Sequence, residues 1–276
     1  MMRLYIEGVG LLGPGLNGWA ASLPILGGLQ DYVPAPAIVP PSALLPANER
    51  RRAAQIVKIA LAVGAEAFSA ARRDPAETTT VFASSGGDGE TIHEILSVLA
   101  SPNRELSPTR FHNSVHNVPA GYWSIATRSQ AASTSLCCHD DSFAAGLLEA
   151  AAQVSAEGHA VALIAYDVPY PRPLSAVRPI GDVFGTALVL APERTEATFA
   201  SVELDLHPGP GTPSAVAPGL EMLRQGTPAA RSLPLLAALA RATEARVIVS
   251  YLDDMALNLT ITPMPPGAGQ QTGSPA

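Results

Sequence analysis

Short apolar runs alternate along the chain with longer segments in which apolar residues recur every three or four positions. The short runs are typical of buried strands. They predict strands over residues 4–12, 78–84, 131–138, 160–166, 186–190 and 198–206, followed by a hairpin of 246–251 with 256–262. Because most of these runs are nearly continuous, both faces of the sheet are expected to be covered.

Five segments carry the helical spacing. The longest, residues 49–73, contains no proline and places Ile56 and Val63 on one face, with Asn48 as the expected N-cap. Gly158 follows another such segment at the position where a left-handed cap is common. The remaining helices are expected over 90–100, 120–127, 142–157 and 233–242. Strands alternating with helices predict an α/β fold, a mixed sheet between helix layers.

Proline and glycine mark the connections. Residues 34–46 are too rich in proline for a regular element and are expected to cross the surface. The Ser-Gly-Gly-Asp-Gly stretch at 85–89 predicts a tight strand-to-helix turn, and Asp253 with Asp254 predicts the tip of the hairpin. Residues 263–276 have the composition of a disordered tail, which leaves 1–262 as a single domain.

Composition and charge exclude several classes of protein. Hydrophobic residues make up 47% and charged residues 15%, so the chain is expected to fold around a core. A net charge of −7 without an extended basic stretch argues against nucleic-acid binding. Residues 8–30 are uncharged, but seven glycines and two prolines interrupt them, so no membrane insertion is expected. Cys137 and Cys138 are adjacent and are expected to stay reduced, which predicts a cytoplasmic protein.

The segment from Ser133 to Glu149 carries the most suggestive chemistry. A strand ends there, the chain turns, and an alanine-rich helix begins, so a side chain at the turn faces the positive end of the helix. Cys138 with His139, Asp140 and Asp141 could supply a nucleophilic thiol. The same residues also fit an inert core cysteine followed by an ordinary aspartate N-cap.

Other polar groups give weaker signals. His112 and His116 lie four residues apart, as zinc ligands on a helix do, but no third ligand is evident, so no metal or other cofactor is expected. The turn at 85–89 matches neither the phosphate-loop nor the dinucleotide pattern. Asp167 and Asp182 have no partner that the sequence identifies.

The order of these segments resembles that of the β-ketoacyl synthases. The resemblance is carried by the opening strand and glycine bend in 4–29, the glycine turn in 81–90, the helix at 117–125, the elbow at 133–149 and the glycine-rich turn and strand at 181–190. It implies a thiolase-like αβαβα layered fold. Residues 1–206 would form its N-terminal half, and 207–262 an abbreviated C-terminal half.

The departures from the family concern its catalytic groups. Counting back from Phe143 puts the family's nucleophile at His139, whereas counting forward from Ala120 puts it at Asp140. An insertion or deletion in the turn would restore Cys138. The two histidines that active family members carry in the C-terminal half have no counterpart, because His207 is the only histidine after residue 206. Without them, condensation lacks its electrostatic stabilisation.

This combination resembles a chain length factor, as in the shortened ketosynthase-like proteins of aryl polyene biosynthesis. The resemblance implies a heterodimer with a partner ketosynthase, served by an acyl carrier protein. The strand at 131–136 would pair across the dimer axis through Ser133, Ser135 and Leu136. Phe143, Asp140 and Asp141 would line the channel wall.

Two alternatives remain open from the sequence. The chain could be an active β-ketoacyl synthase or acyltransferase that uses Cys138, with His112 or His116 as its base. It could also be a binding module for an acyl group or a carrier protein.

Overall fold

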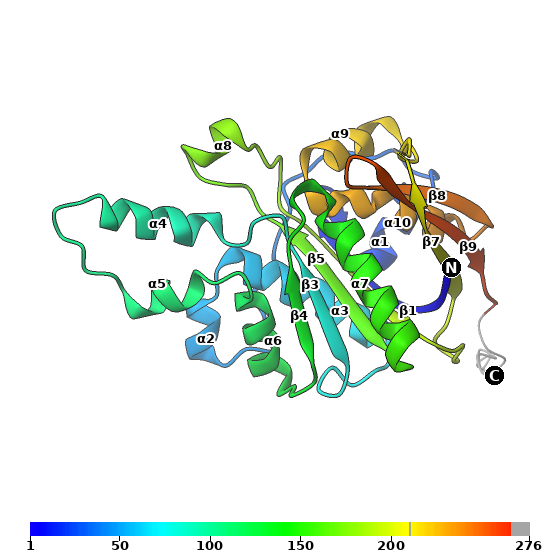
Figure 1. The fold of residues 1–276 in the computed structure, drawn as a ribbon, viewed down its shortest axis with the longest axis horizontal. Helices are drawn as coiled ribbons and strands as arrows, with labels where there is room; N and C mark the ends of the chain where they lie inside the picture. Colours follow the sequence, from blue (N-terminus) through cyan, green and yellow to red (C-terminus); the bar gives the residue numbers. More distant parts are fainter. Residues whose placement is uncertain (210, 266–276) are drawn as a thin grey trace, which may run out of the picture.

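A computed structural model describes residues 1–209 and 211–265, which fold around one nine-stranded sheet (Figure 1). The strand order is β4-β3-β5-β6-β1-β7-β9-β8, and β2 pairs with the end of β1. The strands are β1 Met2–Gly13, β2 Leu16–Asn17, β3 Thr79–Ala83, β4 Ser133–Leu136, β5 Val161–Asp167, β6 Phe184–Ala191, β7 Ala200–Pro208, β8 Ala245–Tyr251 and β9 Met255–Pro263. All eight predicted strands are present.

Strand β1 belongs to both parts of the sheet. Its first half, Met2–Ile6, pairs with β7, and Tyr5–Leu12 pairs with β6. The register with β6 shifts between Ile6 and Gly8, which leaves Glu7 in a bulge. A bulge bends its strand and increases the local twist. The sheet can therefore turn from its mainly parallel part (β4, β3, β5) to the antiparallel part (β7, β9, β8).

Two cores lie on opposite faces of the first part of the sheet. Helices α3 and α6 cover one face through an aromatic group that includes Phe68, Phe82 and Trp123. Helices α7 and α10 fill the other side and also contact β8. The α-helices are α1 Trp19–Leu26, α2 Ala47–Arg52, α3 Gln55–Ala71, α4 Gly89–Leu99, α5 Pro108–Asn113, α6 Val118–Thr127, α7 Ser142–Glu157, α8 Leu174–Val177, α9 Pro218–Gly226 and α10 Leu233–Arg241.

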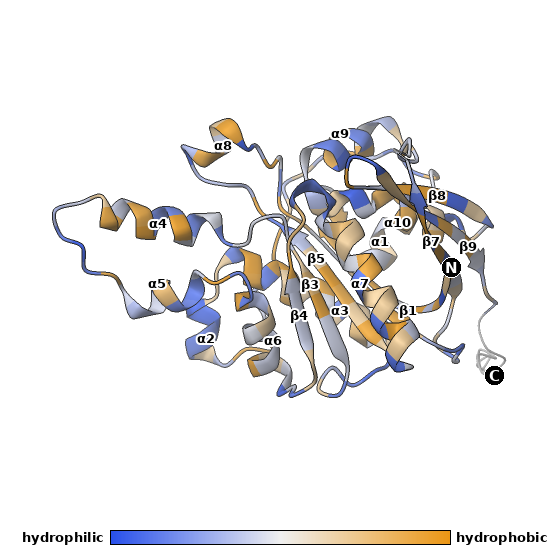
Figure 2. Cartoon of the chain, in the orientation of Figure 1, coloured by the Kyte–Doolittle hydropathy of each residue, from blue (hydrophilic) through white to orange (hydrophobic). Residues whose placement is uncertain are grey.

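The arrangement confirms the predicted thiolase-like fold with a reduced C-terminal half. The inward residues of the second part of the sheet, such as Val247, Leu257 and Leu259, are buried in the core. Its outer face carries polar side chains instead, including Glu203, Asp205, Arg246, Asn258 and Thr260 around a shallow hollow of about 400 Å³. The colouring of β7, β8 and β9 in Figure 2 is correspondingly mixed. Among the described residues, no helix layer covers the outer face of β7, β8 and β9, and in this respect the C-terminal half is reduced.

Most of the predicted helices and connections are confirmed, but the helix expected over 49–73 is wrong in one respect. It is broken at Ala53, whose backbone is extended, into α2 and α3. The Asn113 side chain donates to the carbonyl of Arg52 and so supplies a partner at the end of α2. Asn48 lies inside α2 and is not its N-cap, because Pro46 takes that position.

The two edges of the sheet differ. At β8, Ser214 exchanges hydrogen bonds with the backbone of Ile248, so a loop covers this edge. At β4 no other segment of the described chain pairs with the outer side, and its residues are exposed or half-buried. The expectation of a buried strand at 131–138 is therefore wrong for the single chain. The predicted disordered tail falls mainly on residues 266–276, which lie outside the described residues.

Candidate functional site

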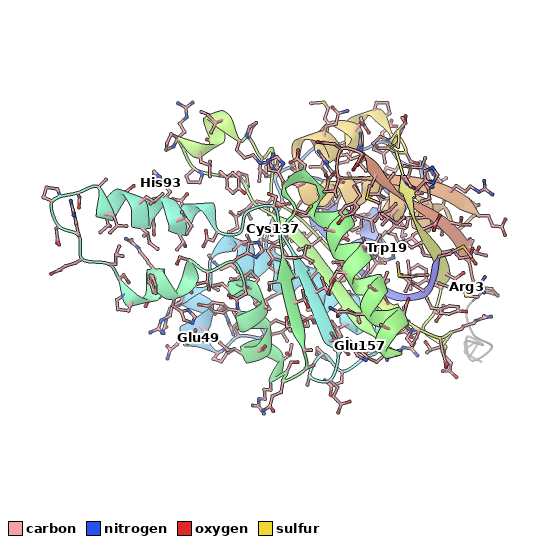
Figure 3. All side chains as sticks on the ribbon, viewed as in Figure 1. Arg3, Trp19, Glu49, His93, Cys137 and Glu157 are labelled. Carbon is pink, nitrogen blue, oxygen red and sulfur yellow. The ribbon has the colours of Figure 1, made fainter. Side chains whose placement is uncertain are left out.

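The elbow between β4 and α7 is a tight turn with a fixed backbone. Cys137 and Cys138 follow β4, and a single 3-10 turn, η1 (His139–Asp141), leads into α7. His139 has a φ of 49°, a left-handed conformation that is uncommon for a residue with a side chain. The Ser142 hydroxyl accepts from the Cys138 amide at 2.9 Å and donates to the His139 carbonyl at 2.8 Å. Figure 3 places Cys137 at the upper end of the sheet, where β4 gives way to α7.

Two arginines from distant segments engage the acidic residues of the elbow. Arg178 donates to Asp140, and Arg231 reaches Asp140 Oδ2 at 3.0 Å and Asp141 Oδ1 at 2.7 Å. The other oxygen of Asp141 accepts from the Leu252 amide at 3.1 Å, at the start of the β8–β9 turn. The elbow is thereby fastened to the C-terminal part of the chain.

Electrostatics at the elbow oppose a reactive thiol. Burial, the Asp141 carboxylate and Cys137 raise the pKa of the Cys138 thiol above its ordinary value. Burial also opposes ionisation of Asp140, but Arg178 and Arg231 outweigh it and hold the Asp140 pKa below its usual range. A raised thiol pKa is the opposite of what a cysteine nucleophile needs, because the thiolate is the reactive form.

The structure separates the residues that the sequence grouped as candidates. His139 points outward, with 70% of its side chain exposed. Cys137 is exposed and Cys138 half-buried. Phe143 is fully buried in the core between the two parts of the sheet. Ser133, Ser135 and Leu136 lie along the open edge of β4.

His112 and His116 do not come together as a ligand pair. His112 lies in the last turn of α5 with its Nδ1 3.1 Å from the Asn113 Oδ1, whereas His116 follows the helix and its Nε2 lies 3.3 Å from the Ser84 carbonyl. Neither hydrogen-bonds with Cys138 among the described residues. Within that same part of the chain, no group of three metal-ligating side chains is found.

The glycine turn after β3 is a tight strand-to-helix turn, as expected. Asp88 caps α4 by accepting from the Thr91 amide at 3.1 Å. Tyr170 packs over the turn so closely that a Cβ at Gly86 would lie 1.9 Å from its hydroxyl oxygen, and one at Gly89 would lie 2.5 Å from its ring. The space beside Gly86 and Gly89 is therefore filled by the Tyr170 side chain.

Sequence reasoning missed Arg178, Arg231 and the partners of Asp167. Asp167 lies fully buried at the end of β5 and accepts from Ser84, Ser85 and Ala229. Asp182 accepts from the amide of its neighbour Val183. No local signal could have found these pairings, because the Arg231–Asp141 contact spans 90 residues.

A surface hollow of about 430 Å³ opens between α5 and α6, and α6 also contacts β4. Phe111, Val115, Val118 and Ile125 supply its apolar wall, and Tyr122 lies at its base. Three of these residues are exposed, with Phe111 the most at 63%. Exposed apolar residues gathered in one place are typical of a contact surface.

A mixed sheet that carries a strand–elbow–helix unit between helix layers is compatible with a ketosynthase-like protein. Residues 29–245 match the β-ketoacyl synthase N-terminal domain family, and the chain belongs to that family. A comparison with curated proteins found no match.

Solved structures agree on the fold. A chain in the structure of the ketosynthase ApeO in complex with its chain length factor ApeC from Xenorhabdus doucetiae has a TM-score of 0.73 at 21% identity, over 94% of this chain and 100% of that one. A chain of the ishigamide ketosynthase/chain length factor has a TM-score of 0.69 at 14% identity, over 95% and 100%. A type II polyketide complex of AntDE with the carrier protein AntF has a TM-score of 0.73 at 11% identity, over 95% and 99%.

The TM-scores show a shared fold, and at these sequence identities the similarity shows the fold alone. In the part of the chain that the structure describes, no helix has both the length and the apolar character needed to cross a bilayer.

Proposed function

We propose that this chain is a non-catalytic subunit of the chain-length-factor type, which supports a partner ketosynthase in polyene or fatty-acid-type acyl chain elongation. The observation that carries the proposal is the chemistry of the elbow. Its left-handed position holds an outward-facing His139, and the neighbouring Asp140 and Asp141 are engaged by arginines. A nucleophile needs a lowered pKa or a base that takes its proton, whereas the pKa of Cys138 is raised and, among the described residues, His112 and His116 hydrogen-bond elsewhere. We assign the elbow residues to the wall of a channel.

The nature of the partner is supported by the structural relatives. The ApeO–ApeC and ishigamide structures each contain a ketosynthase and a chain length factor, and a carrier protein is present in the AntDE–AntF complex. We infer the same three components for this chain: a heterodimer with a ketosynthase, supplied by an acyl carrier protein. Two unpaired cysteines fit a reducing cytoplasm.

The open edge of β4 is where we propose that the partner ketosynthase binds. Unpaired backbone groups at a sheet edge favour pairing with another strand. The apolar hollow between α5 and α6 lies near this edge and would be covered by the same partner. We further propose that residues 1–262 behave as one domain, because β1 pairs with β6 in one part of the sheet and with β7 in the other, and β7 in turn pairs with β9.

The proposal that this chain is non-catalytic is tested by locating the protein that becomes acylated during elongation. The chain and its ketosynthase partner are incubated together with acyl carrier protein thioesters, and intact-protein mass spectrometry locates the acyl group. The partner alone is expected to gain an acyl mass. Cys138→Ala is expected to leave elongation by the complex within about twofold of wild type, since a channel-wall residue contributes no bond-making step.

The matched control is Cys137→Ala, which removes the neighbouring exposed thiol. An acyl adduct on Cys138, together with loss of elongation in Cys138→Ala alone, would instead identify an active synthase or acyltransferase. Failure of the chain to co-elute with any ketosynthase while it binds a carrier protein would identify a binding module.

The proposed edge pairing gives a second test. The carbonyls of Ala132 and Leu136 accept from β3, so the backbone groups of Ser133 and Ser135 face outward. Ser135→Pro removes one outward donor and spares the ladder with β3. It is expected to weaken association with the partner about tenfold or more, which corresponds to at least about 1.4 kcal/mol.

Association is measured by titration of the labelled partner, with thermal unfolding of the isolated chain as the check on folding. Ser97→Pro, in the exposed part of α4, is the control for a proline that disturbs the fold elsewhere. If Ser135→Pro retains full affinity while the chain is folded, the partner does not pair with β4.

A further inference from the structure

Asp167 is a buried carboxylate that has no cation beside it among the described residues. Its Oδ1 accepts from the Ser85 amide at 2.8 Å and from the Ser84 hydroxyl at 3.1 Å. Its Oδ2 accepts from the Ala229 amide at 2.8 Å. Three donors satisfy the carboxylate, but none of them neutralises it.

These donors belong to two segments that are far apart in sequence. Ser84 and Ser85 begin the glycine turn after β3, whereas Ala229 lies in the 3-10 helix η2 (Pro228–Ser232). The same short helix carries Arg231, which engages both acids of the elbow. Asp167 therefore ties the sheet to the element that positions Arg231.

The surroundings of Asp167 do not favour its charge. Burial raises the pKa of Asp167 to about 6, although its hydrogen bonds oppose the shift. Tyr170, from the following loop, is the phenol that faces it, whereas Tyr166, the preceding residue of β5, points to the opposite face of the sheet. His116 packs against the glycine turn, with its Nε2 3.3 Å from the Ser84 carbonyl. The nearby arginines, Arg178 and Arg231, are turned to the elbow acids instead.

We propose that Asp167 is a proton-linked latch that sets how firmly η2, and with it Arg231, is held against the elbow. In the closed position the carboxylate is sealed from water by η2 and the glycine turn. When η2 moves away, water reaches the carboxylate and replaces the missing counter-charge. This inference concerns the chain itself and does not depend on the proposed function.

The sign of the effect follows from linkage. The carboxylate binds its proton more tightly in the closed state than in the open, solvated state, so protonation favours closure. Opening becomes easier as the pH rises from the ordinary aspartate pKa of 3.8 toward about 6, and it levels off above that. A shift of about two pH units corresponds to about a hundredfold change in the opening equilibrium.

Hydrogen exchange measures this opening. Exchange of the peptide that contains Ala229 is followed in the full chain between pH 4 and pH 7.5, and each rate is divided by the intrinsic rate at that pH. The opening equilibrium of wild type is expected to rise up to about hundredfold over this range. In Asp167→Asn the group cannot titrate, so opening is expected to be independent of pH, whatever its absolute level.

Two references separate the latch from general unfolding. A peptide from β6, in the centre of the sheet, is expected to show no such dependence in the same sample. Asp182→Asn, which alters a carboxylate that accepts from Val183, is expected to keep the wild-type dependence. The proposal is overturned if opening of η2 in wild type does not vary with pH, if Asp167→Asn retains the dependence, or if β6 shares it.

Discussion

Replacement of Gly10 by alanine is expected to destabilise the protein by about 3 kcal/mol or more. Strand β1 crosses α3 here at backbone distance. A Cβ at Gly10 would lie 1.9 Å from the carbonyl oxygen of Val63 and 2.7 Å from its carbonyl carbon. Because both atoms belong to the helix backbone, no change of rotamer relieves the overlap. Either β1 or α3 must shift within a close-packed core.

Denaturant unfolding of the variant measures the loss. Gly121→Ala is the matched control, because a Cβ at this exposed position of α6 meets nothing within 4 Å. That substitution is expected to stabilise the protein by about 1 kcal/mol through helix propensity. Equal unfolding free energies for the two variants would show that the β1–α3 contact does not limit the size of residue 10.

Arg73→Ala is expected to cost about 3 kcal/mol, at the lower end of the range for breaking a buried ion pair. Glu7, in the bulge of β1, keeps only 1% of its side chain exposed and pairs with Arg73, which is 32% exposed. Thr195 also donates to Glu7 at 2.6 Å, but a hydroxyl cannot neutralise the carboxylate. Loss of Arg73 therefore leaves a buried charge without its counter-charge.

Arg3→Ala is the control. Arg3 lies on β1, as Glu7 does, and its ion pair with Glu203 of β7 is exposed, so its loss is expected to change stability little. The double variant Glu7→Gln with Arg73→Ala removes the stranded charge, so it is expected to regain most of the loss. If the double variant is no more stable than Arg73→Ala, the cost comes from lost packing of the arginine.

The strands and most helices could be predicted because their signals are local. β5 and β6 are nearly continuous apolar runs, and the structure buries every residue of both. The left-handed cap at Gly158 follows from the backbone freedom of glycine, and its φ is 68°. Patterns of this kind are complete within ten to twenty residues.

The break between α2 and α3 could not be predicted in this way. Residues 49–73 contain no proline, and the one glycine, Gly64, lies inside α3 against Trp123. The interruption at Ala53 coincides with a hydrogen bond from Asn113, which comes from a segment 61 residues away. A tertiary contact thus overrides a local helical pattern.

The sequence by itself determined the order of the predicted strands and of most helices, the family resemblance and the position of the elbow, because each depends on residues that are neighbours in the chain. It gave no pattern for α5, α8 or α9. It left the nucleophile between Cys138, His139 and Asp140. Only the tertiary structure decided the electrostatics there. Arg178 and Arg231 approach from later segments, and burial raises the thiol pKa. Charge and solvation act through space, so the protonation of the elbow residues is determined only when the chain has folded.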